Sequence, residues 1–338
     1  MQSLNFIIII SIFIILNLLL FFFHKNLSKI YRIQDFPDNK RKIHSKPISV
    51  IGGFYFLLNF VIFILIDMFN LSSVNFVLSG RELILFFISF LSFFLLGFLD
   101  DKYDLKPNVK LISAFIITYF FITLSDDFII QELRFSFYST ISLKQFSIFF
   151  TIICILLFIN AINMFDGSNC QILIYFILTS FLLIKINNSY QFLIFFVPVF
   201  ISLFYLNYKN LLFLGNSGVN LISFIFSIFI INNYHNEKLY ADQIFLIMII
   251  PGLELIRIFS TRIKNGIHPF KSDNDHLHHY LLKIYDTDKT LIFLFLILLT
   301  PALFFFFNTS TVISLPIIIL IYAVLIFFFK KKIKKLNY

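Results

Sequence analysis

The strongest constraint on this chain is a series of long apolar segments that recurs along its whole length. Runs of 18 or more apolar residues are typical of membrane-spanning helices. Of the 338 residues, 59% are hydrophobic and only 13% are charged, whereas a soluble domain carries about 25% charged residues. We therefore predict an all-α, polytopic integral membrane protein.

The apolar segments predict eleven membrane spans within a single transmembrane domain over residues 1–338. The first segment lacks a basic start and a small-residue cleavage site, so we interpret it as a retained helix and not as a signal peptide. Several segments are shorter than a full span, which indicates broken helices, a thin local bilayer or misplaced ends. The expected spans are residues 6–23, 50–69, 83–99, 109–125, 146–162, 171–186, 189–206, 219–232, 241–258, 289–306 and 311–329.

Basic residues are distributed unevenly between the two sides of this topology. One set of loops, with the tail, holds all but five of the 27 Lys and Arg residues. By the positive-inside rule this side faces the cytoplasm, which predicts a multi-pass protein of the cell inner (plasma) membrane. The net charge of +9 then reflects topology and attraction to anionic lipid, and it does not argue for nucleic-acid binding. The five exceptions are Arg81, Arg134, Lys144, Lys185 and Lys238.

Unusual polar residues gather in clusters on the cytoplasmic side, and the first candidate cluster is a group of aspartates. Asp100 and Asp101 end an apolar segment, and Asp104 follows one helical turn after Asp100. Residues three and four apart share a helix face, so these carboxylates are expected to converge. A solvated helix boundary is the alternative. The other polar clusters at the same depth favour a buried role as a base or toward a metal.

The motif NAINMFDG places amide and carboxylate oxygens at the end of another span. Asn160, Asn163 and Asp166 follow each other at intervals of three, which lines one helical stripe. These oxygens are hard ligands that suit Mg²⁺, an ion that is often shared with substrate phosphates. Capping of the helix end by Asn and Gly is the structural alternative.

Two further loops carry weaker signals. The motif FLGNSG, residues 213–218, precedes a span, where backbone amides at a helix N-terminus can bind an anion. An ordinary turn explains it equally well. The first cytoplasmic loop contains Lys42 and His44, which we interpret either as a clamp for a phosphate or nucleotide or as the positive-inside signal itself.

The densest group of ionisable residues is HPFKSDNDHLHH, residues 268–279. Its last three histidines are His276, His278 and His279. Imidazole N–H groups with Lys and Arg nearby fit the binding of a phosphate or diphosphate. A zinc site is a weaker interpretation, because no thiolate or H-E-x-x-H frame accompanies the histidines, and a solvated loop stays open as well.

Together these clusters resemble the polyprenyl-phosphate N-acetylhexosamine-1-phosphate transferases, in particular the bacterial branch that loads GlcNAc-1-phosphate onto undecaprenyl phosphate. The resemblance extends from about Arg41 to Leu282. It rests on five motifs in the family's order: RKIHSKPISVIGG, DDKYD, NAINMFDG, FLGNSG and HPFKSDNDHLHH. A single motif is moderately specific, whereas all five in order on one predicted membrane face are strong.

The resemblance implies transfer of an N-acetylhexosamine 1-phosphate from a UDP-sugar to polyprenyl phosphate, with Mg²⁺ or Mn²⁺ as cofactor. The expected partners are these two substrates and the bilayer, and the sequence leaves a homodimer open. The implied catalytic residues are the pair Asp100 and Asp101, then Asp166, His276, His278 and His279. The implied metal ligands are Asn163 and Asn216, and the substrate-binding candidates are Lys42, His44, Asn160 and Asp104.

One departure from the family's pattern affects the implied metal site. The family has an aspartate that binds Mg²⁺ in the position where this chain has Asn216. An amide oxygen can still coordinate Mg²⁺, but it lacks the negative charge that strengthens the attraction. The alternative function is therefore a catalytically impaired relative that binds polyprenyl phosphate or nucleotide-sugar. A transporter is less favoured. The ionisable residues lie at helix ends, whereas a transport pathway places them near the midplane of the bilayer.

Overall fold

The structure is a computed structural model, and it describes residues 2–31, 33–37, 46–69, 78, 80–267 and 275–336. Lys42 and His44 lie outside the described residues. The chain divides into two compact units, and each is described by itself. Unit 1 comprises Met1–Asp127 and Leu183–Ile228, and unit 2 comprises Phe128–Leu182 and Phe229–Tyr338. The single transmembrane domain expected from the sequence stays a prediction.

The chain is almost entirely helical and is a polytopic membrane protein, as the sequence predicts. Within the described residues, eight helices are long and apolar enough to cross a membrane. Three further apolar helices are shorter: Gly52–Met68, Gln171–Ile186 and Phe192–Tyr208. The eight and the three together coincide with the eleven expected segments, but a count of eleven spans is not confirmed, because the shorter helices do not reach the length of a full span.

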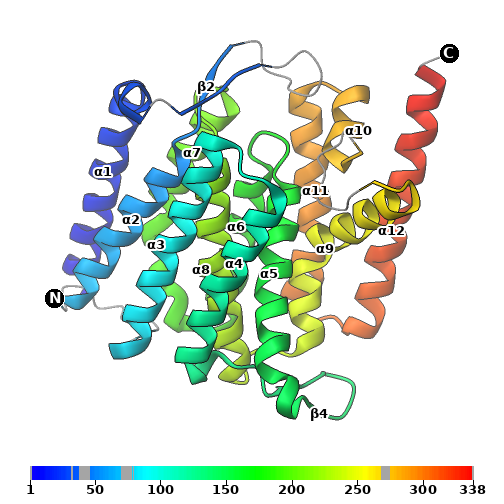
Figure 1. The fold of residues 1–338 in the computed structure, drawn as a ribbon, viewed down its shortest axis with the longest axis horizontal. Helices are drawn as coiled ribbons and strands as arrows, with labels where there is room; N and C mark the ends of the chain where they lie inside the picture. Colours follow the sequence, from blue (N-terminus) through cyan, green and yellow to red (C-terminus); the bar gives the residue numbers. More distant parts are fainter. Residues whose placement is uncertain are drawn as a thin grey trace. The chain divides into compact units, whose positions relative to one another are not determined.

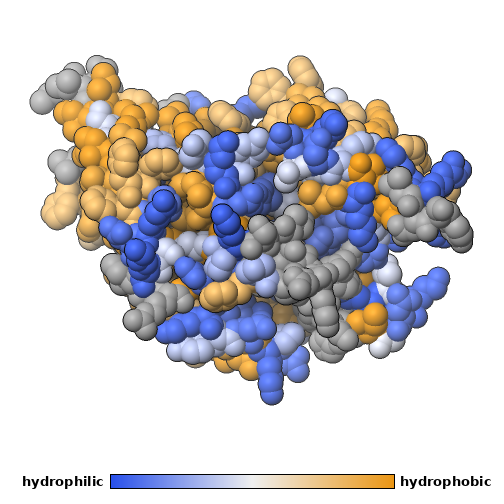
Figure 2. Space-filling model, turned by 90° about the horizontal axis from the view of Figure 1, so that it is seen from above, coloured by the Kyte–Doolittle hydropathy of each residue, from blue (hydrophilic) through white to orange (hydrophobic). Residues whose placement is uncertain are grey.

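The surface carries many large apolar side chains that a soluble protein would cover. Ile15, Leu320 and Phe327 are 58%, 65% and 70% exposed. Hydrophilic residues, blue in Figure 2, gather over much of the face that this view draws. Exposed apolar side chains of this kind suit a chain that crosses a bilayer, because lipid can cover them.

Unit 1 contains helices and one small antiparallel sheet. Its elements are α1 (Gln2–Tyr31), β1 (Gln34–Asp35), β2 (Ile48–Ser49), α2 (Gly52–Met68), α3 (Gly80–Tyr103), α4 (Pro107–Leu124), most of the 3-10 helix η1 (Asp126–Phe128), the 3-10 helix η3 (Asn188–Phe196), α7 (Val197–Tyr208) and the first part of α8 (Gly215–His235). α3 packs against α4, and α7 packs against α1 and α2 (Figure 1). In the sheet, Gln34 pairs with Ser49.

Phenylalanine rings fill the interior of unit 1. Phe63, Phe86 and Phe90 are fully buried, and Phe60 is 1% exposed. The ring centroids of Phe60 and Phe90 lie 4.9 Å apart, a separation at which aromatic pairs attract each other. The apolar side chains of unit 1 therefore pack on one another as well as facing lipid.

The segment before α8 is fixed by backbone hydrogen bonds to the start of α2. Phe213 donates its N–H to the Ser49 carbonyl at 2.8 Å, and Gly52 donates its N–H to the Phe213 carbonyl at 3.0 Å. Gly53 likewise donates to the Leu214 carbonyl at 3.1 Å. These bonds satisfy backbone groups near two helix starts, and they hold the FLGNSG segment beside α2.

Unit 2 contains a hairpin and most of the helices in the second half of the chain. Its elements are β3 (Glu132–Leu133), β4 (Ile141–Ser142), the 3-10 helix η2 (Lys144–Phe146), α5 (Ser147–Phe165), most of α6 (Gln171–Ile186), the end of α8, α9 (Ala241–Lys264), α10 (Leu277–Ile284), α11 (Thr287–Phe306) and α12 (Thr311–Leu336). α9 packs against α5, α11 and α12, and the short α10 contacts both α11 and α12 (Figure 1).

Two segments differ in secondary structure from what the sequence predicts. The segment expected as one span at 189–206 is a 3-10 helix, η3, followed by α7. Pro198 lies in the first turn of α7, where its missing N–H costs nothing, so the α-helix begins there. The histidine segment, treated as a loop, forms the helix α10 after His276.

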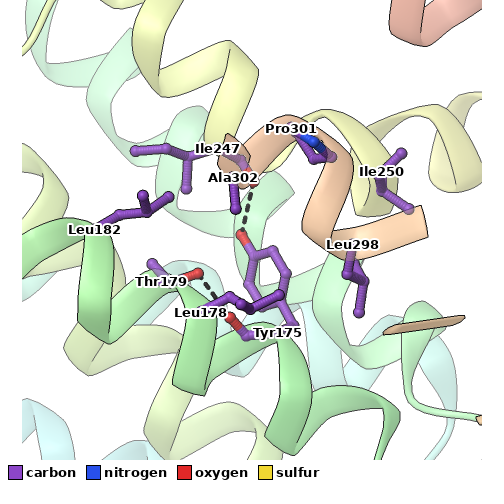
Figure 3. Close-up of a pocket in the computed structure, with 9 residues that line it drawn as sticks. All are labelled: Tyr175, Leu178, Thr179, Leu182, Ile247, Ile250, Leu298, Pro301 and Ala302. Atoms are coloured by element: carbon purple, nitrogen blue, oxygen red, sulfur yellow. Dashed lines mark hydrogen bonds between the residues drawn. The ribbon is translucent and has the colours of Figure 1, made fainter. Parts of the chain in front are cut away.

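A proline inside α9 leaves a carbonyl that another helix satisfies. Pro251 has no N–H to donate to the carbonyl of Ile247, four residues earlier. The hydroxyl of Tyr175 on α6 lies 3.5 Å from that carbonyl and donates to it (Figure 3). A small apolar pocket surrounds this contact, with Leu298 and Pro301 of α11 in its wall. A membrane helix tolerates proline when a neighbouring side chain supplies the missing bond.

Candidate functional site

The aspartate pair of unit 1 lies at the C-terminal end of α3, where both carboxylates are held by partners. Asp100 is 5% exposed, and its Oδ1 lies 2.7 Å from the Lys110 ammonium on α4. The same oxygen accepts the N–H of Leu105 at 3.0 Å. A charge this buried needs such a partner, so Lys110 is a site residue that the sequence analysis did not identify.

The second carboxylate of the pair caps another helix. Asp101 accepts the backbone N–H of Asn216 at 2.7 Å on Oδ1 and that of Ser217 at 3.0 Å on Oδ2. These amides belong to the first turn of α8, where the helix itself offers no acceptor and where negative charge is stabilised. Two of the amides that the sequence suggested as an anion site therefore bind the chain's own carboxylate.

Glycines allow the start of α8 to approach α3 and α2 closely. A Cβ added to Gly97 on α3 would overlap the backbone of Asn216 and Ser217, and one added to Gly53 on α2 would lie 2.7 Å from the Gly218 nitrogen. Gly215 has φ +74°, a conformation that side chains rarely adopt. The backbone of FLGNSG is therefore placed by contact as well as by hydrogen bonds.

Asp104 does not continue the helical face of Asp100. It follows the last residue of α3, has φ +48° and is exposed. Asp and Asn adopt this left-handed conformation more readily than most residues. The structure thus places one buried carboxylate, one capping carboxylate and one exposed carboxylate within DDKYD.

In unit 2, the NAINMFDG motif forms the end of α5. Asn160 and Asn163 lie in its last turns, and Asp166 is the C-cap residue that donates its N–H to Ile162 at 2.9 Å. The Asn160 amide donates to the Leu156 carbonyl at 2.7 Å. Asn160 and Asn163 therefore lie on a helix as expected, and Asp166 lies at the end of that helix.

The three histidines lie close together at the start of α10. His276 is the N-cap residue, and His278 and His279 lie in the first turn. Ring centroids are 5.2 Å apart for His276 and His278 and 4.3 Å apart for His278 and His279. His276 and His278 are 8% and 3% exposed. His276 and His278 are therefore buried, whereas His279 is partly exposed.

His278 joins the histidine motif to the NAINMFDG motif. A Cβ added to Gly167 would overlap the imidazole of His278, so that ring lies directly on the backbone of the residue after Asp166. Only glycine leaves room for this approach. Two of the five sequence motifs thus meet within unit 2, although they lie far apart in the chain.

Burial and nearby charge keep His278 neutral. Loss of hydration lowers the pKa of His278 well below its usual value. Electrostatic repulsion from His279, His276 and Arg257 lowers this pKa further. A neutral imidazole has one N–H donor and one acceptor nitrogen. His278 can therefore donate to a phosphate oxygen without carrying charge into the site.

Few of the described side chains of unit 2 could hold a metal ion. Within the described residues, no group of three or more His, Cys, Asp and Glu side chains has the arrangement to hold a metal ion. Mg²⁺ is usually bound through one or two carboxylates, with water and substrate phosphates as its remaining ligands. At the end of α5, Asp166 has a carboxylate and Asn163, three residues earlier, has an amide oxygen, and these are the residues that could hold such an ion.

Two charged residues near the histidines were missed by the sequence analysis. Glu254 and Arg257 lie on α9 and form an ion pair, with Arg257 Nη2 2.9 Å from Glu254 Oε1. Glu254 also accepts the N–H of Leu277, the first residue of α10, at 2.7 Å. Opposite charges one turn apart inside an apolar helix are the signal that could have identified them.

Comparison with known proteins identifies relatives. The profile of glycosyl transferase family 4 matches residues 83–233, which include the aspartate pair, NAINMFDG and FLGNSG. The undecaprenyl-phosphate alpha-N-acetylglucosaminyl 1-phosphate transferase of Escherichia coli (strain K12) is 23% identical over 291 residues, 81% of this chain and 76% of that protein. The protein of the same name from Thermotoga maritima is 27% identical over 260 residues, 77% of this chain and 76% of that protein. These matches confirm the resemblance on which the sequence analysis relied.

Proposed function

We propose that this chain, a relative of the polyprenyl-phosphate N-acetylglucosamine-1-phosphate transferases, transfers GlcNAc 1-phosphate from its UDP derivative to undecaprenyl phosphate and releases UMP. The observation that carries the proposal is the packing of His278 on Gly167, which joins two of the motifs within unit 2. The relatives, matched over 76% of their length, supply the substrate class. The product would start a cell-envelope glycan.

The reaction exchanges one phosphoanhydride for another. An oxygen of the lipid phosphate attacks the sugar-bearing phosphorus, the bond to UMP breaks, and the UMP oxygen leaves with the electron pair. Because bond types are conserved, little driving force is needed, and catalysis consists mainly of positioning two anions and neutralising their charge. Hydrogen-bond donors in a buried site serve both purposes.

In unit 2, the histidines are assigned to the phosphates or the sugar. His276, His278 and His279 offer N–H donors from a helix whose first residues are buried. Asp166 is assigned to the nucleotide-sugar pocket, and Asn160, two turns before it on α5, is assigned as a further substrate contact. A neutral His278 can accept or donate a hydrogen bond as the phosphate geometry changes.

In unit 1, the two aspartates are assigned different tasks. Asp101 uses one hydrogen bond on each oxygen to hold α8, so we assign it the placement of the FLGNSG segment. Among the described residues, both contacts of the Asp100 carboxylate fall on Oδ1. We therefore assign Asp100 to the lipid phosphate, which Oδ2 of Asp100 would orient or deprotonate. Lys110 would balance the negative charge of the Asp100 carboxylate.

Mg²⁺, or Mn²⁺ in its place, is the proposed cofactor. Asn163 and Asn216 are the ligands that the resemblance assigns, and Asp166 lies beside Asn163 at the end of α5. When bound, the ion neutralises charge on the diphosphate. We place the protein in the plasma membrane with these residues toward the cytoplasm, where UDP-sugars are available.

The test follows two labels from one substrate. Membranes that contain the chain are supplied with UDP-GlcNAc labelled in the sugar or in the β-phosphate, together with undecaprenyl phosphate. Both labels are expected in the lipid extract in equal amounts, because sugar and phosphate move as one group. Transfer of the sugar label alone, or no transfer by folded protein, contradicts the proposal. In the second case, binding of labelled UDP-GlcNAc without turnover would indicate the impaired relative.

A further inference from the structure

A buried carboxylate on α9 contacts the first residue of the histidine helix. Glu254 is 1% exposed. Its Oε1 accepts the N–H of Leu277 at 2.7 Å and lies 3.7 Å from Nδ1 of His276. α10 is only eight residues long, so its first turn needs an acceptor for its N–H groups, and Glu254 supplies one.

Arg257 holds the residue that precedes the histidines. Its Nη1 lies 3.2 Å from Oδ2 of Asp275, and its Nη2 donates to the Asp275 backbone carbonyl. Asp275 in turn accepts the hydroxyl of Tyr280, one turn into α10. Burial and the hydrogen bond to Asp275 raise the pKa of Tyr280, so this hydroxyl keeps its proton and remains a donor. The start of α10 is thus fixed on both sides of His276.

A third helix completes this arrangement. Tyr322 on α12 donates its hydroxyl to Oε2 of Glu254, and the same hydroxyl lies 3.1 Å from Nε of Arg257. Both oxygens of Glu254 are therefore used, Oε1 by Leu277 and Arg257 and Oε2 by Arg257 and Tyr322. An amide could not replace this carboxylate, since it has only one acceptor atom.

We propose that Glu254 is a positioning residue for the phosphosugar transfer, because its carboxylate, held by Arg257 and Tyr322, sets where α10 begins and therefore where the three imidazoles lie. The inference rests on the proposed function and goes beyond it, because Glu254 lies outside the five motifs. A shift of about 1 Å in a substrate-positioning group can cost about a hundredfold in rate. α10 is short and starts with no side-chain cap of its own, so it depends on this external carboxylate.

The first experiment measures the stability of α10 and does not depend on activity. Amide hydrogen exchange is followed in peptides that cover residues 276–284 of the purified full chain, in wild type and in Glu254→Gln. Loss of a charge-assisted hydrogen bond predicts exchange that is faster by roughly tenfold. Asp242→Asn is the matched control, since Asp242 is a buried carboxylate at the other end of α9 that accepts from Ser136 and Thr311. It should leave exchange in α10 unchanged.

The second experiment measures UMP release per folded molecule. Glu254→Gln is expected to lower kcat by about a hundredfold, with Glu254→Asp intermediate because it restores the charge on a shorter side chain. Asp242→Asn should keep wild-type kcat. Unchanged exchange in Glu254→Gln, equal acceleration in Asp242→Asn, or an unchanged kcat would each overturn the proposal. If the wild type itself releases no UMP, the proposed function fails, whereas the exchange result still decides whether Glu254 places α10.

Discussion

The imidazole of His278 lies directly on the backbone of Gly167, with no space for even one additional carbon atom between them. This contact joins α10, at whose start the three histidines lie, to the end of α5, where Asn163 and Asp166 lie. It follows that the relative position of two motifs depends on one residue having no side chain.

Replacing Gly167 with alanine should therefore displace His278. The new Cβ cannot fit, so either α10 or the end of α5 must move, at a cost of about 1–3 kcal/mol of stability. UMP release should fall by about a hundredfold or more, because the histidines and Asp166 separate. Gly252→Ala is the control, since a Cβ there meets no atom within 4 Å and alanine favours a helix. Equal activity in the two variants would show that the contact has no role.

Removing the carboxylate of Asp101 should loosen the start of α8. Asp101→Ala leaves the N–H groups of Asn216 and Ser217 without this acceptor, which should cost about 1–3 kcal/mol of unfolding free energy. Thermal unfolding in detergent measures the loss. Asp104→Asn serves as the control, because Asp104 is exposed and Asn tolerates its positive φ. A loss no larger than that of the control would remove the capping role.

Restoring a carboxylate at position 216 should strengthen metal dependence. Asn216→Asp adds negative charge beside Asp101, which already bonds to the backbone of residue 216. The Mg²⁺ concentration for half-maximal UMP release should fall at least about tenfold, and the unfolding temperature in EDTA should fall because the two carboxylates repel. Asn210→Asp, at an exposed turn with φ +53°, is the control. If the metal titration does not move, residue 216 does not contribute to a metal site.

The folded chain should lose stability in mild acid because of His278. Its pKa is lowered in the folded state by burial and by His279, His276 and Arg257, whereas an unfolded histidine titrates near pH 6.5. Above that pH neither state binds the proton, and His278 gives no pH dependence. As the pH falls below about 6.5, only the unfolded state gains the proton, so stability falls by up to about 1.4 kcal/mol per pH unit. Thermal unfolding of His278→Asn between pH 7.5 and 5.5 should show a flatter dependence, and an identical slope would contradict this assignment.

Hydropathy was enough to predict the membrane class and the place of each long helix, because apolar length is a local property of the sequence. It failed where a single residue changes the backbone. Pro198 lies in the first turn of α7, and a 3-10 helix precedes α7, so the segment expected at 189–206 is broken. The helix α10 is short, with two histidines in its first turn and a third at its N-cap, and its apolar residues are too few to be recognised as a helix by periodicity alone.

The candidate site was predicted residue by residue from motifs, but the partners of those residues were not. Asp100, Asp166 and the histidines were named from the sequence, whereas Lys110 and Glu254 emerged only from packing. The contact between Asp100 and Lys110 joins two helices, so the spacing within either helix does not contain it. Glu254 had a local signal in its partner Arg257, one turn away on α9, but its contact with Leu277 of α10 is seen only in the fold. Asp101 shows the same limit, since its spacing suggested convergence with Asp104 and its hydrogen bonds instead cap α8.

The most direct test of the account is UMP release by the purified chain in detergent with UDP-GlcNAc, undecaprenyl phosphate and a titration of Mg²⁺ or Mn²⁺, with EDTA as the blank. The account predicts release that requires the lipid phosphate and the metal together. Folded protein that releases no UMP at any metal concentration, or that releases it equally without the lipid, would contradict the proposed transfer.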